Sequence, residues 1–290
     1  MKLPFSYKAV SLSGSAINGT YPPLGFYPFA EHQLGNGDTF GLYWPIGHED
    51  SEPIVAETYH DEWSIQPHFS TLDRFLEASA RSEEADEDEQ FIGTPTVFED
   101  PQSPAACLKA AREHLKSQNV TSAIALLESS VSVLPEYTEA QALLCTQYRR
   151  VGQPEAALRS AIQSIISPSC FGTSSVQILK WLSAQSNVPS EIARDPVWLN
   201  RGGLSMKFGG VKENDEYLLM RTIIDEYLSN GAFIPALTLM QKYAELMSAE
   251  TVSFQERYQF DRKRFVAWQH DIAINQYGKS RVLDLTAGNT

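Results

Sequence analysis

The hydrophobic positions of this chain follow a strand-like pattern in its first third. Residues 39–44 (TFGLYW) and residues 53–59 (PIVAETY) are short runs rich in aromatic and β-branched side chains, and the polar run 47–52 separates them. Such runs favour strands, and a polar segment with a glycine favours a turn. The pattern predicts a β-hairpin here and, for this part of the chain, an α+β fold with a small antiparallel sheet.

After the predicted hairpin, the apolar residues change to helical spacing. Leu72, Phe75 and Leu76 share one face of a helix, Ser70 is suited to cap its amino end, and Asp73 falls in its first turn. We therefore expect a short amphipathic helix that begins at Ser70.

Beyond residue 104 the helical spacing continues, and the sequence repeats itself after 34 residues. Four pairs of positions recur: His114 and Tyr148, Ala123 and Ala157, Leu127 and Ala161, and Ser130 and Ser164. This period resembles the tetratricopeptide repeat, a helix-turn-helix unit whose small residues let two helices approach. The resemblance implies helical hairpins, with Ala123 and Ala157 where paired helices cross.

The rest of the chain extends the helical prediction. Residues 226–237 match the turn of the second repeat and predict a third hairpin, with an insertion near residues 200–210 before it. The apolar spacing of residues 253–277 predicts one closing helix. Together these patterns predict an all-α, tetratricopeptide-like array of helical hairpins.

An acidic and proline-rich stretch lies between the two patterns. Residues 83–89 carry six acidic side chains, and prolines follow at positions 95, 101 and 104. Such a stretch buries little apolar area, so we interpret it as a solvated linker; direct contact with a basic partner is the alternative. The predicted domains are an acidic α+β domain (1–80), a linker (81–104) and a helical domain (105–290).

The distribution of charge points to the class of partner. Residues 1–100 contain 4 Lys and Arg against 18 Asp and Glu, whereas residues 101–290 contain 19 against 18, which together give the net charge of -13. An anionic module repels nucleic acid and anionic lipid and attracts a cationic protein surface. No run approaches the ~18 apolar residues of a membrane span. The three cysteines fall in predicted helices, which indicates buried reduced thiols and a cytoplasmic protein.

A family resemblance adds to this interpretation. Residues 35–44 (GNGDTFGLYW), the second predicted strand, the segment 61–63 (DEW) and the helix start at 69–72 resemble the SMI1/KNR4-like, or SUKH, superfamily over residues 20–80. Many bacterial members of that superfamily are immunity proteins. The resemblance therefore implies a protein that binds and neutralises a toxin delivered by a neighbouring cell.

Acidic and aromatic residues interleave in the predicted hairpin region. The predicted partner-binding residues are Tyr43, Trp44, Glu49, Asp50, Glu52, Asp61, Glu62 and Trp63. Aromatic side chains supply rigid contact area, and carboxylates pair with Lys or Arg of a partner and speed its capture. The alternative is that the aromatic residues fill a small core and the acids are exposed hairpin residues.

Motifs for catalysis are missing from the sequence. His48, His60 and His68 are spaced by 12 and 8 residues, which matches no zinc signature. We expect no catalytic residue, no metal site, no cofactor and no enzyme activity. Three functions stay open: an immunity protein that binds a basic toxin, a repeat adaptor or chaperone that holds a peptide or secretion substrate, and a hydrolase with a His/Asp site. The sequence leaves the oligomeric state open.

Overall fold

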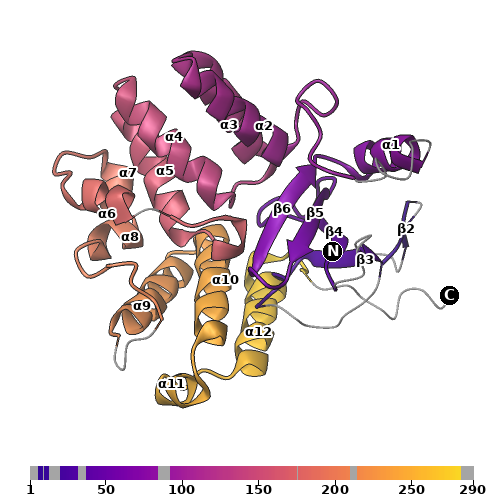
Figure 1. Ribbon diagram of the computed structural model, residues 1–290. Helices are drawn as coiled ribbons and strands as arrows, with labels where there is room; N and C mark the ends of the chain where they lie inside the picture. The colour runs from indigo at the N-terminus through magenta and orange to yellow at the C-terminus, as the bar shows by residue number, and fades with distance from the viewer. Residues whose placement is uncertain are drawn as a thin grey trace. The chain divides into compact units, whose positions relative to one another are not determined.

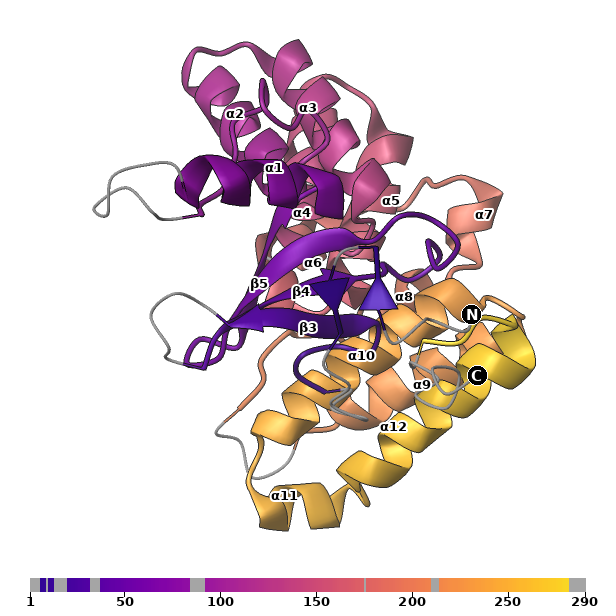
Figure 2. The ribbon, with the colours of Figure 1, turned by 90° about the vertical axis from the view of Figure 1, so that its right-hand side faces the viewer.

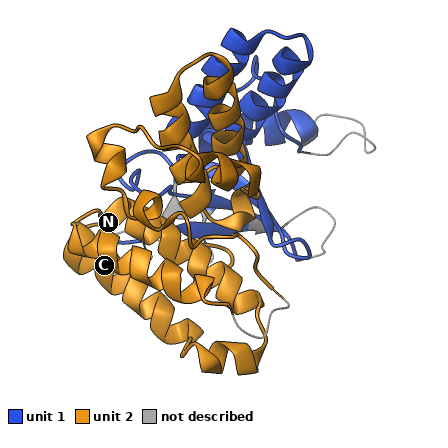
Figure 3. Cartoon of the chain, turned by 90° about the vertical axis from the view of Figure 1, so that its left-hand side faces the viewer, with its two compact units in different colours: residues 1–16, 25–135, 280–290 blue, residues 17–24, 136–279 orange. Residues whose placement is uncertain are grey.

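Two compact units make up the protein. The computed structural model describes residues 6–8, 10–12, 20–31, 37–83, 92–174, 176–209 and 214–281, whose elements are labelled in Figure 1. Unit 1 contains residues 1–16, 25–135 and 280–290, and unit 2 contains residues 17–24 and 136–279 (Figure 3). The chain therefore passes between the units four times. No helix in the described residues has the length and apolar character needed to cross a bilayer.

Unit 1 is built on a four-stranded antiparallel sheet with the order β3-β4-β5-β6. Its strands are β3 (Phe26–Glu31), β4 (Thr39–Tyr43), β5 (Ile54–Tyr59) and β6 (Ser64–Phe69). A separate two-stranded ladder joins β1 (Ser6–Tyr7) to β2 (Val10–Ser11). The predicted hairpin is confirmed as β4 and β5, and so is the small antiparallel sheet.

One row of large side chains crosses the whole sheet. Tyr27 pairs with Leu42, Leu42 with Val55, and Val55 with Phe69. Residues directly opposite each other share a face of the sheet, so these four side chains form a continuous apolar stripe. All four are buried and belong to the core of unit 1.

Helix α1 (Leu72–Glu83) covers this stripe. It packs against β5 and β6, and Figure 2 shows it lying over β5. The Phe75 ring centroid lies 5.0 Å from that of Phe40 and 5.7 Å from that of Phe69. Burying Phe75 and Leu72 in this way stabilises the docked helix by about 1.5–3 kcal/mol for each side chain.

The amino end of α1 differs from the prediction by one residue. Thr71 Oγ1 accepts a hydrogen bond from the Arg74 amide at 3.3 Å, so Thr71 caps the helix. Ser70 instead donates its amide and its hydroxyl to the Asp100 carboxylate, each at 2.7 Å. The prediction of Ser70 as the cap is wrong because a carboxylate 30 positions away binds it.

A helical hairpin of unit 1 follows the loop at residues 92–103. Helices α2 (Pro104–Lys116) and α3 (Val120–Val133) pack against each other, and α2 also contacts β6. Ser103 caps α2 by accepting from the Ala106 amide at 3.1 Å, and its hydroxyl donates to the His68 carbonyl of β6. Unit 1 thus continues past the predicted linker to residue 135. Residues 84–91, which hold most of the acidic run, lie outside the described residues.

The segment that follows unit 2 returns to unit 1 through Arg281. This buried guanidinium donates from Nη1 to Glu49 Oε1 at 2.6 Å and from Nη2 to the Trp44 carbonyl at 2.9 Å. The Arg281 carbonyl in turn accepts the Tyr27 hydroxyl at 2.7 Å. Arg281 and Glu49 are only 3% and 1% exposed, so the pair is fully removed from water.

Unit 2 is helical. Its elements are α4 (Thr138–Arg150), α5 (Pro154–Ile166), η2 (Ser169–Phe171), α6 (Val176–Ser183), α7 (Ser190–Ala193), α8 (Pro196–Asn200), α9 (Glu216–Ser229), α10 (Phe233–Ala249), α11 (Val252–Arg257), α12 (Arg262–Asp271) and η3 (Ile272–Tyr277). The pairs α4–α5 and α9–α10 are antiparallel neighbours joined by short turns, and α10 also packs against α5 and α12. The predicted helical region is therefore confirmed, and the described residues 201–209 carry no helix where an insertion was expected.

The predicted single closing helix is wrong. Helix α11 ends before Gln259, whose φ of 52° lies in the left-handed region, and Asp261 begins α12 by accepting the Arg264 amide at 2.8 Å. Between them Phe260 is buried, with its ring 5.5 Å from that of Phe265. The chain turns here because the burial of the Phe260 ring and the capping of a new helix compensate for the hydrogen bonds that a continuous helix would have formed.

Candidate functional site

The turn between β5 and β6 presents three exposed residues among the predicted contact residues. The Glu62 amide donates to the Tyr59 carbonyl at 3.2 Å, and the Trp63 amide donates to the His60 carbonyl at 3.3 Å. Trp63 adopts a φ of 51°, an unusual left-handed conformation for a bulky side chain. Such conformations cost about 1–3 kcal/mol and persist where the surroundings fix them.

A buried carboxylate, that of Asp38, holds this turn by binding His60. Asp38 Oδ1 accepts the His60 amide at 2.7 Å and lies 2.8 Å from His60 Nδ1. The hydrogen bond to Asp38 raises the pKa of His60 above its ordinary value, and the nearby Asp61, 3.2 Å from Nε2, also raises it. Sequence reasoning missed Asp38, because its partner lies 22 positions away on another strand end.

Three predicted residues project from the turn. Asp61 and Glu62 are exposed, with the Asp61 side chain 90% exposed, and Trp63 is 38% exposed. An indole that follows two carboxylates in the chain can bind Lys or Arg through ion pairs and through the face of its ring. The structure therefore brings the 61–63 part of the predicted site together on one fixed turn.

Three other predicted contact residues belong to the interior. Tyr43, Trp44 and Glu49 are 0%, 3% and 1% exposed. Tyr43 lies opposite Ile54 in the sheet, and Trp44 and Glu49 bind Arg281. Their assignment to a contact surface needs correction, since a side chain without exposed area cannot bind a partner in this fold.

The remaining two predicted acids are exposed, but one of them is neutralised within unit 1. Lys8 Nζ lies 2.8 Å from both Glu52 Oε1 and Asp73 Oδ2. The hydrogen bonds to Asp73 and Glu52 raise the pKa of Lys8. Glu52 therefore offers a partner less net charge than its exposure suggests, whereas Asp50 is exposed on the β4–β5 connection.

One of the three histidines considered for the hydrolase alternative, His68, forms a buried network with residues of β5. His68 Nε2 lies 3.1 Å from Glu57 Oε2, and its Nδ1 lies 2.8 Å from Thr94 Oγ1. The Tyr59 hydroxyl also donates to Glu57 Oε2 at 2.8 Å, and burial together with this bond raises the pKa of Tyr59. This network attaches the segment at Thr94 to the sheet. Among the described residues, no group of three or more His, Cys, Asp and Glu side chains is arranged to hold a metal ion.

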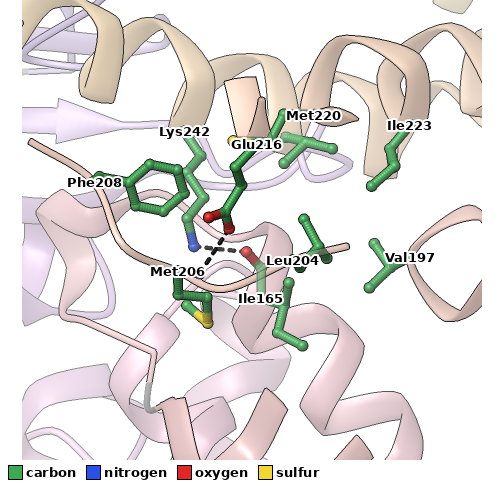
Figure 4. A pocket seen from close by; sticks show the side chains of 10 residues that line it. Ile165, Val197, Leu204, Met206, Phe208, Glu216, Met220, Ile223 and Lys242 are labelled. Atoms are coloured by element: carbon green, nitrogen blue, oxygen red, sulfur yellow. Dashed lines mark hydrogen bonds between the residues drawn. The ribbon is translucent and has the colours of Figure 1, made fainter. Parts of the chain in front are cut away.

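A second cluster of buried charges lies in unit 2, between α5, α9 and α10 (Figure 4). Lys242 Nζ donates to the Ile165 carbonyl at 2.6 Å, and burial lowers the pKa of Lys242 to about 8. The Glu216 carboxylate accepts the Ser205 and Met206 amides at 3.0 and 2.7 Å. Figure 4 shows Lys242 and Glu216 pointing toward one another, and otherwise the lining is apolar.

One turn along α10, a buried carboxylate complements this lysine. Glu245 Oε2 accepts the Ser169 amide at the start of η2 at 2.8 Å, and burial raises the pKa of Glu245 to about 8. Lys242 meets the carboxyl end of α5, where a positive charge is favourable, and Glu245 accepts an amide at the start of η2. The cavity beside Lys242 has a volume of about 20 Å³, room for about one water. We therefore interpret this cluster as structural.

The three cysteines agree with the expectation of buried reduced thiols. Cys107, Cys145 and Cys170 are all free and buried. Burial raises the pKa of each thiol, that of Cys145 to about 11. A thiol with a raised pKa is a poor nucleophile, because the thiolate is the reactive form.

Comparisons with known proteins place the chain in a family. The family model of the YfbP N-terminal domain matches residues 12–91, and that of the YfbP C-terminal domain matches residues 207–282. The Escherichia coli (strain K12) protein described as uncharacterized protein YfbP is 38% identical to this chain over 265 residues, which cover 91% of this chain and 92% of that protein. Since one relative is this similar over nearly the full length of both chains, the chain belongs to the YfbP family.

Proposed function

We propose that this protein acts by binding a protein partner with a basic surface, and that the β5–β6 turn is its principal contact. The observation that carries the proposal is the exposed triplet Asp61, Glu62 and Trp63 on a turn held by the buried Asp38. Contact residues fixed before binding lose little conformational entropy when a partner docks. Tryptophan is also one of the residue types that contribute most of the binding energy at protein interfaces.

The class of partner that we propose is a cognate toxin effector, which the protein neutralises in the cytoplasm as an immunity protein. The SUKH-like resemblance of residues 20–80, the net charge of -14 in residues 1–100 and the three buried reduced cysteines support this proposal. An acidic binder captures a basic toxin quickly through long-range attraction, which suits a protein that must act before the toxin does.

The binding proposal is tested with the tagged full-length chain. A pull-down from the native host at low and high salt identifies the candidate partner, which is then purified and titrated against three variants. We expect Trp63→Ala to weaken binding roughly thirtyfold or more, and Asp61→Asn/Glu62→Gln to weaken it about tenfold with a smaller salt dependence. The matched control is Asp225→Asn/Glu256→Gln, which removes the same charge from exposed positions of unit 2. Equal affinities for all variants would show that the turn is not the contact.

The toxin part of the proposal needs a separate test in cells. The identified partner is expressed from a repressible promoter with and without this protein. We expect the partner to stop growth when expressed alone, the wild-type chain to restore growth, and Trp63→Ala to restore it poorly. A partner that does not inhibit growth would contradict the immunity role while leaving the binding surface intact.

A second candidate function is that of a repeat adaptor or chaperone that holds a peptide or secretion substrate. The 34-residue repeat supports it, because two of the four matched pairs are equally buried in two separate hairpins: Ala123 and Ala157 are both 0% exposed, as are Ser130 and Ser164. An adaptor would bind short peptides and tolerate changes in the β5–β6 turn. Peptide binding that is unaffected by Trp63→Ala, with no stoichiometric basic partner, would favour this function.

A further inference from the structure

A surface hollow of about 500 Å³ lies in unit 2 at the carboxyl end of α4. It is formed by the last turn of α4, the α4–α5 turn and α6, three segments that are neighbours in the fold (Figure 1). The residues that line it are Thr146, Arg149, Arg150, Gly152, Pro154, Trp181 and Gln185. Its chemistry is therefore that of two guanidinium groups beside an indole.

One guanidinium is positioned by the indole. Arg149 Cζ lies 4.7 Å from the centre of the Trp181 ring, a cation–π contact. The Gln185 side-chain amide donates to the Trp181 carbonyl at 3.0 Å and so closes the end of α6 beside the ring. Arg149 is exposed but restrained, which reduces the entropy that a ligand must remove on binding.

The carboxylates closest along the chain are already engaged elsewhere. Glu155, which follows Pro154 of the hollow, binds Arg159 at 3.0 Å, and Glu191 binds the same guanidinium at 2.8 Å. Within the described part of the chain, neither Arg149 nor Arg150 forms an ion pair. The hollow is consequently a local positive site on a chain whose net charge is -13.

The two arginines are not needed to close the end of α4. Backbone amides already bind its last carbonyls: Val151 donates to the Gln147 carbonyl at 3.0 Å, Gly152 to that of Arg149 at 3.3 Å, and Gln153 to that of Tyr148 at 2.8 Å. The guanidinium groups therefore keep their donors for another acceptor. Each presents a planar fork that matches a carboxylate with two parallel hydrogen bonds.

The backbone around the hollow favours carboxylates over phosphate. A phosphate site is usually a cradle of successive free amides at the start of a helix. Here the amides of Gly152 and Gln153 are bound to carbonyls of α4, and Pro154, the next residue, has no amide hydrogen. The uncapped amides that follow Pro154 in α5 belong to Glu155 and Ala156, which are not among the lining residues, so the lining holds an anion through its side chains.

We propose that this hollow binds an acidic segment of a partner protein, in which two nearby carboxylates pair with Arg149 and Arg150 and an apolar side chain lies on Trp181. The site is open and large enough for side chains of an extended peptide. It lies in unit 2 and is opposite in charge to the β5–β6 turn, so it does not depend on the function proposed above.

The test uses the full-length protein and two fluorescein-labelled peptides of equal length, one an Asp-Glu-Leu repeat and the other an Asn-Gln-Leu repeat. Fluorescence anisotropy measures the binding of each. We expect the acidic peptide to bind and the neutral one not to bind, and Arg149→Gln/Arg150→Gln to weaken the acidic peptide about a hundredfold, tenfold for each arginine. Trp181→Leu should weaken it less, because it removes the ring and the restraint on Arg149.

Three controls make the result decisive. Lys263→Gln/Arg264→Gln removes two exposed positive charges from α12 and should leave the affinity within about twofold, as should Trp63→Ala in unit 1. Circular dichroism confirms that each variant is folded. No binding of the acidic peptide, or binding unchanged in Arg149→Gln/Arg150→Gln, overturns the proposal. Inorganic phosphate that displaces the peptide at equal anion concentration would overturn the choice of a carboxylate ligand.

Discussion

The buried pair of Arg281 and Glu49 allows a quantitative prediction for the variant Arg281→Met. Methionine keeps much of the length of the side chain but removes the guanidinium that donates to Glu49 at 2.6 Å and to the Trp44 carbonyl at 2.9 Å. The Glu49 carboxylate, 1% exposed, would then stay buried without its counter-charge, although the Gly47 amide still donates to it at 3.1 Å. The variant therefore tests how much unit 1 depends on residues that follow unit 2.

The expected loss is large compared with the stability of a domain. Removing one partner of a buried ion pair costs about 3–5 kcal/mol, because the other charge stays desolvated after its counter-charge is lost. A typical domain unfolds with only about 5–15 kcal/mol. By contrast, Arg74→Met breaks an ion pair between exposed side chains, since Arg74 is 46% exposed and its partner Glu77 is 61% exposed. This change should cost less than about 1 kcal/mol.

Amide hydrogen exchange followed by mass spectrometry measures this loss in unit 1 alone. We expect the amides of β4 and β5 to exchange about a hundredfold faster or more in Arg281→Met, and nearly as in the wild type in Arg74→Met. The double variant Glu49→Gln/Arg281→Met should recover part of the protection, since it no longer buries a charge. If the amides of β4 and β5 exchange at the same rate in Arg281→Met and in Arg74→Met, the reasoning from the buried pair is refuted.

Two further predictions concern titratable groups. Burial raises the pKa of Glu245 to about 8, so its contribution to the stability of unit 2 is complete below about pH 4.5 and is lost as the pH rises to 8. The urea midpoint of unfolding should therefore fall between about pH 5 and 8, and Glu245→Gln should remove this part of the pH dependence. The pKa of His60 is raised chiefly by its hydrogen bond to Asp38, so Asp38→Asn should lower the pKa read from the imidazole NMR signals. An unchanged His60 titration in Asp38→Asn would contradict the side-chain hydrogen bond between His60 Nδ1 and Asp38.

Local patterns explain why many elements were predictable from the sequence. The β-branched and aromatic runs at 39–44 and 53–59 became β4 and β5, and the helical spacing after residue 70 became α1. These features depend on the period of side chains along the backbone, which the sequence carries directly. The prediction of one closing helix overlooked a signal for the break near residue 260, because Asp261 is a preferred helix-capping residue.

The buried part of the candidate site could not be predicted in the same way. Residues 54–58 of β5 are all buried, so both faces of this strand are covered and alternation does not distinguish core from surface. Glu49 is an acidic residue in a polar segment and was therefore expected to be exposed, but it is buried in an ion pair with Arg281, 232 positions away. Residues 61–63 were included because acidic and aromatic residues interleave there, and they are exposed because they form the turn between β5 and β6.

The alternation of the chain between its two units also sets an order of events during synthesis. Glu49 leaves the ribosome 232 residues before Arg281, and at about 5–20 residues per second this interval lasts roughly 10–50 s. The Thr20 carbonyl and the Leu24 amide likewise form their hydrogen bonds to the Gln241 side chain only after that residue has been synthesised. Throughout that interval the Glu49 carboxylate of unit 1 lacks the guanidinium with which it is paired in the finished protein. The yield of folded protein should therefore depend on the rate of translation and on chaperones that hold the unfinished chain.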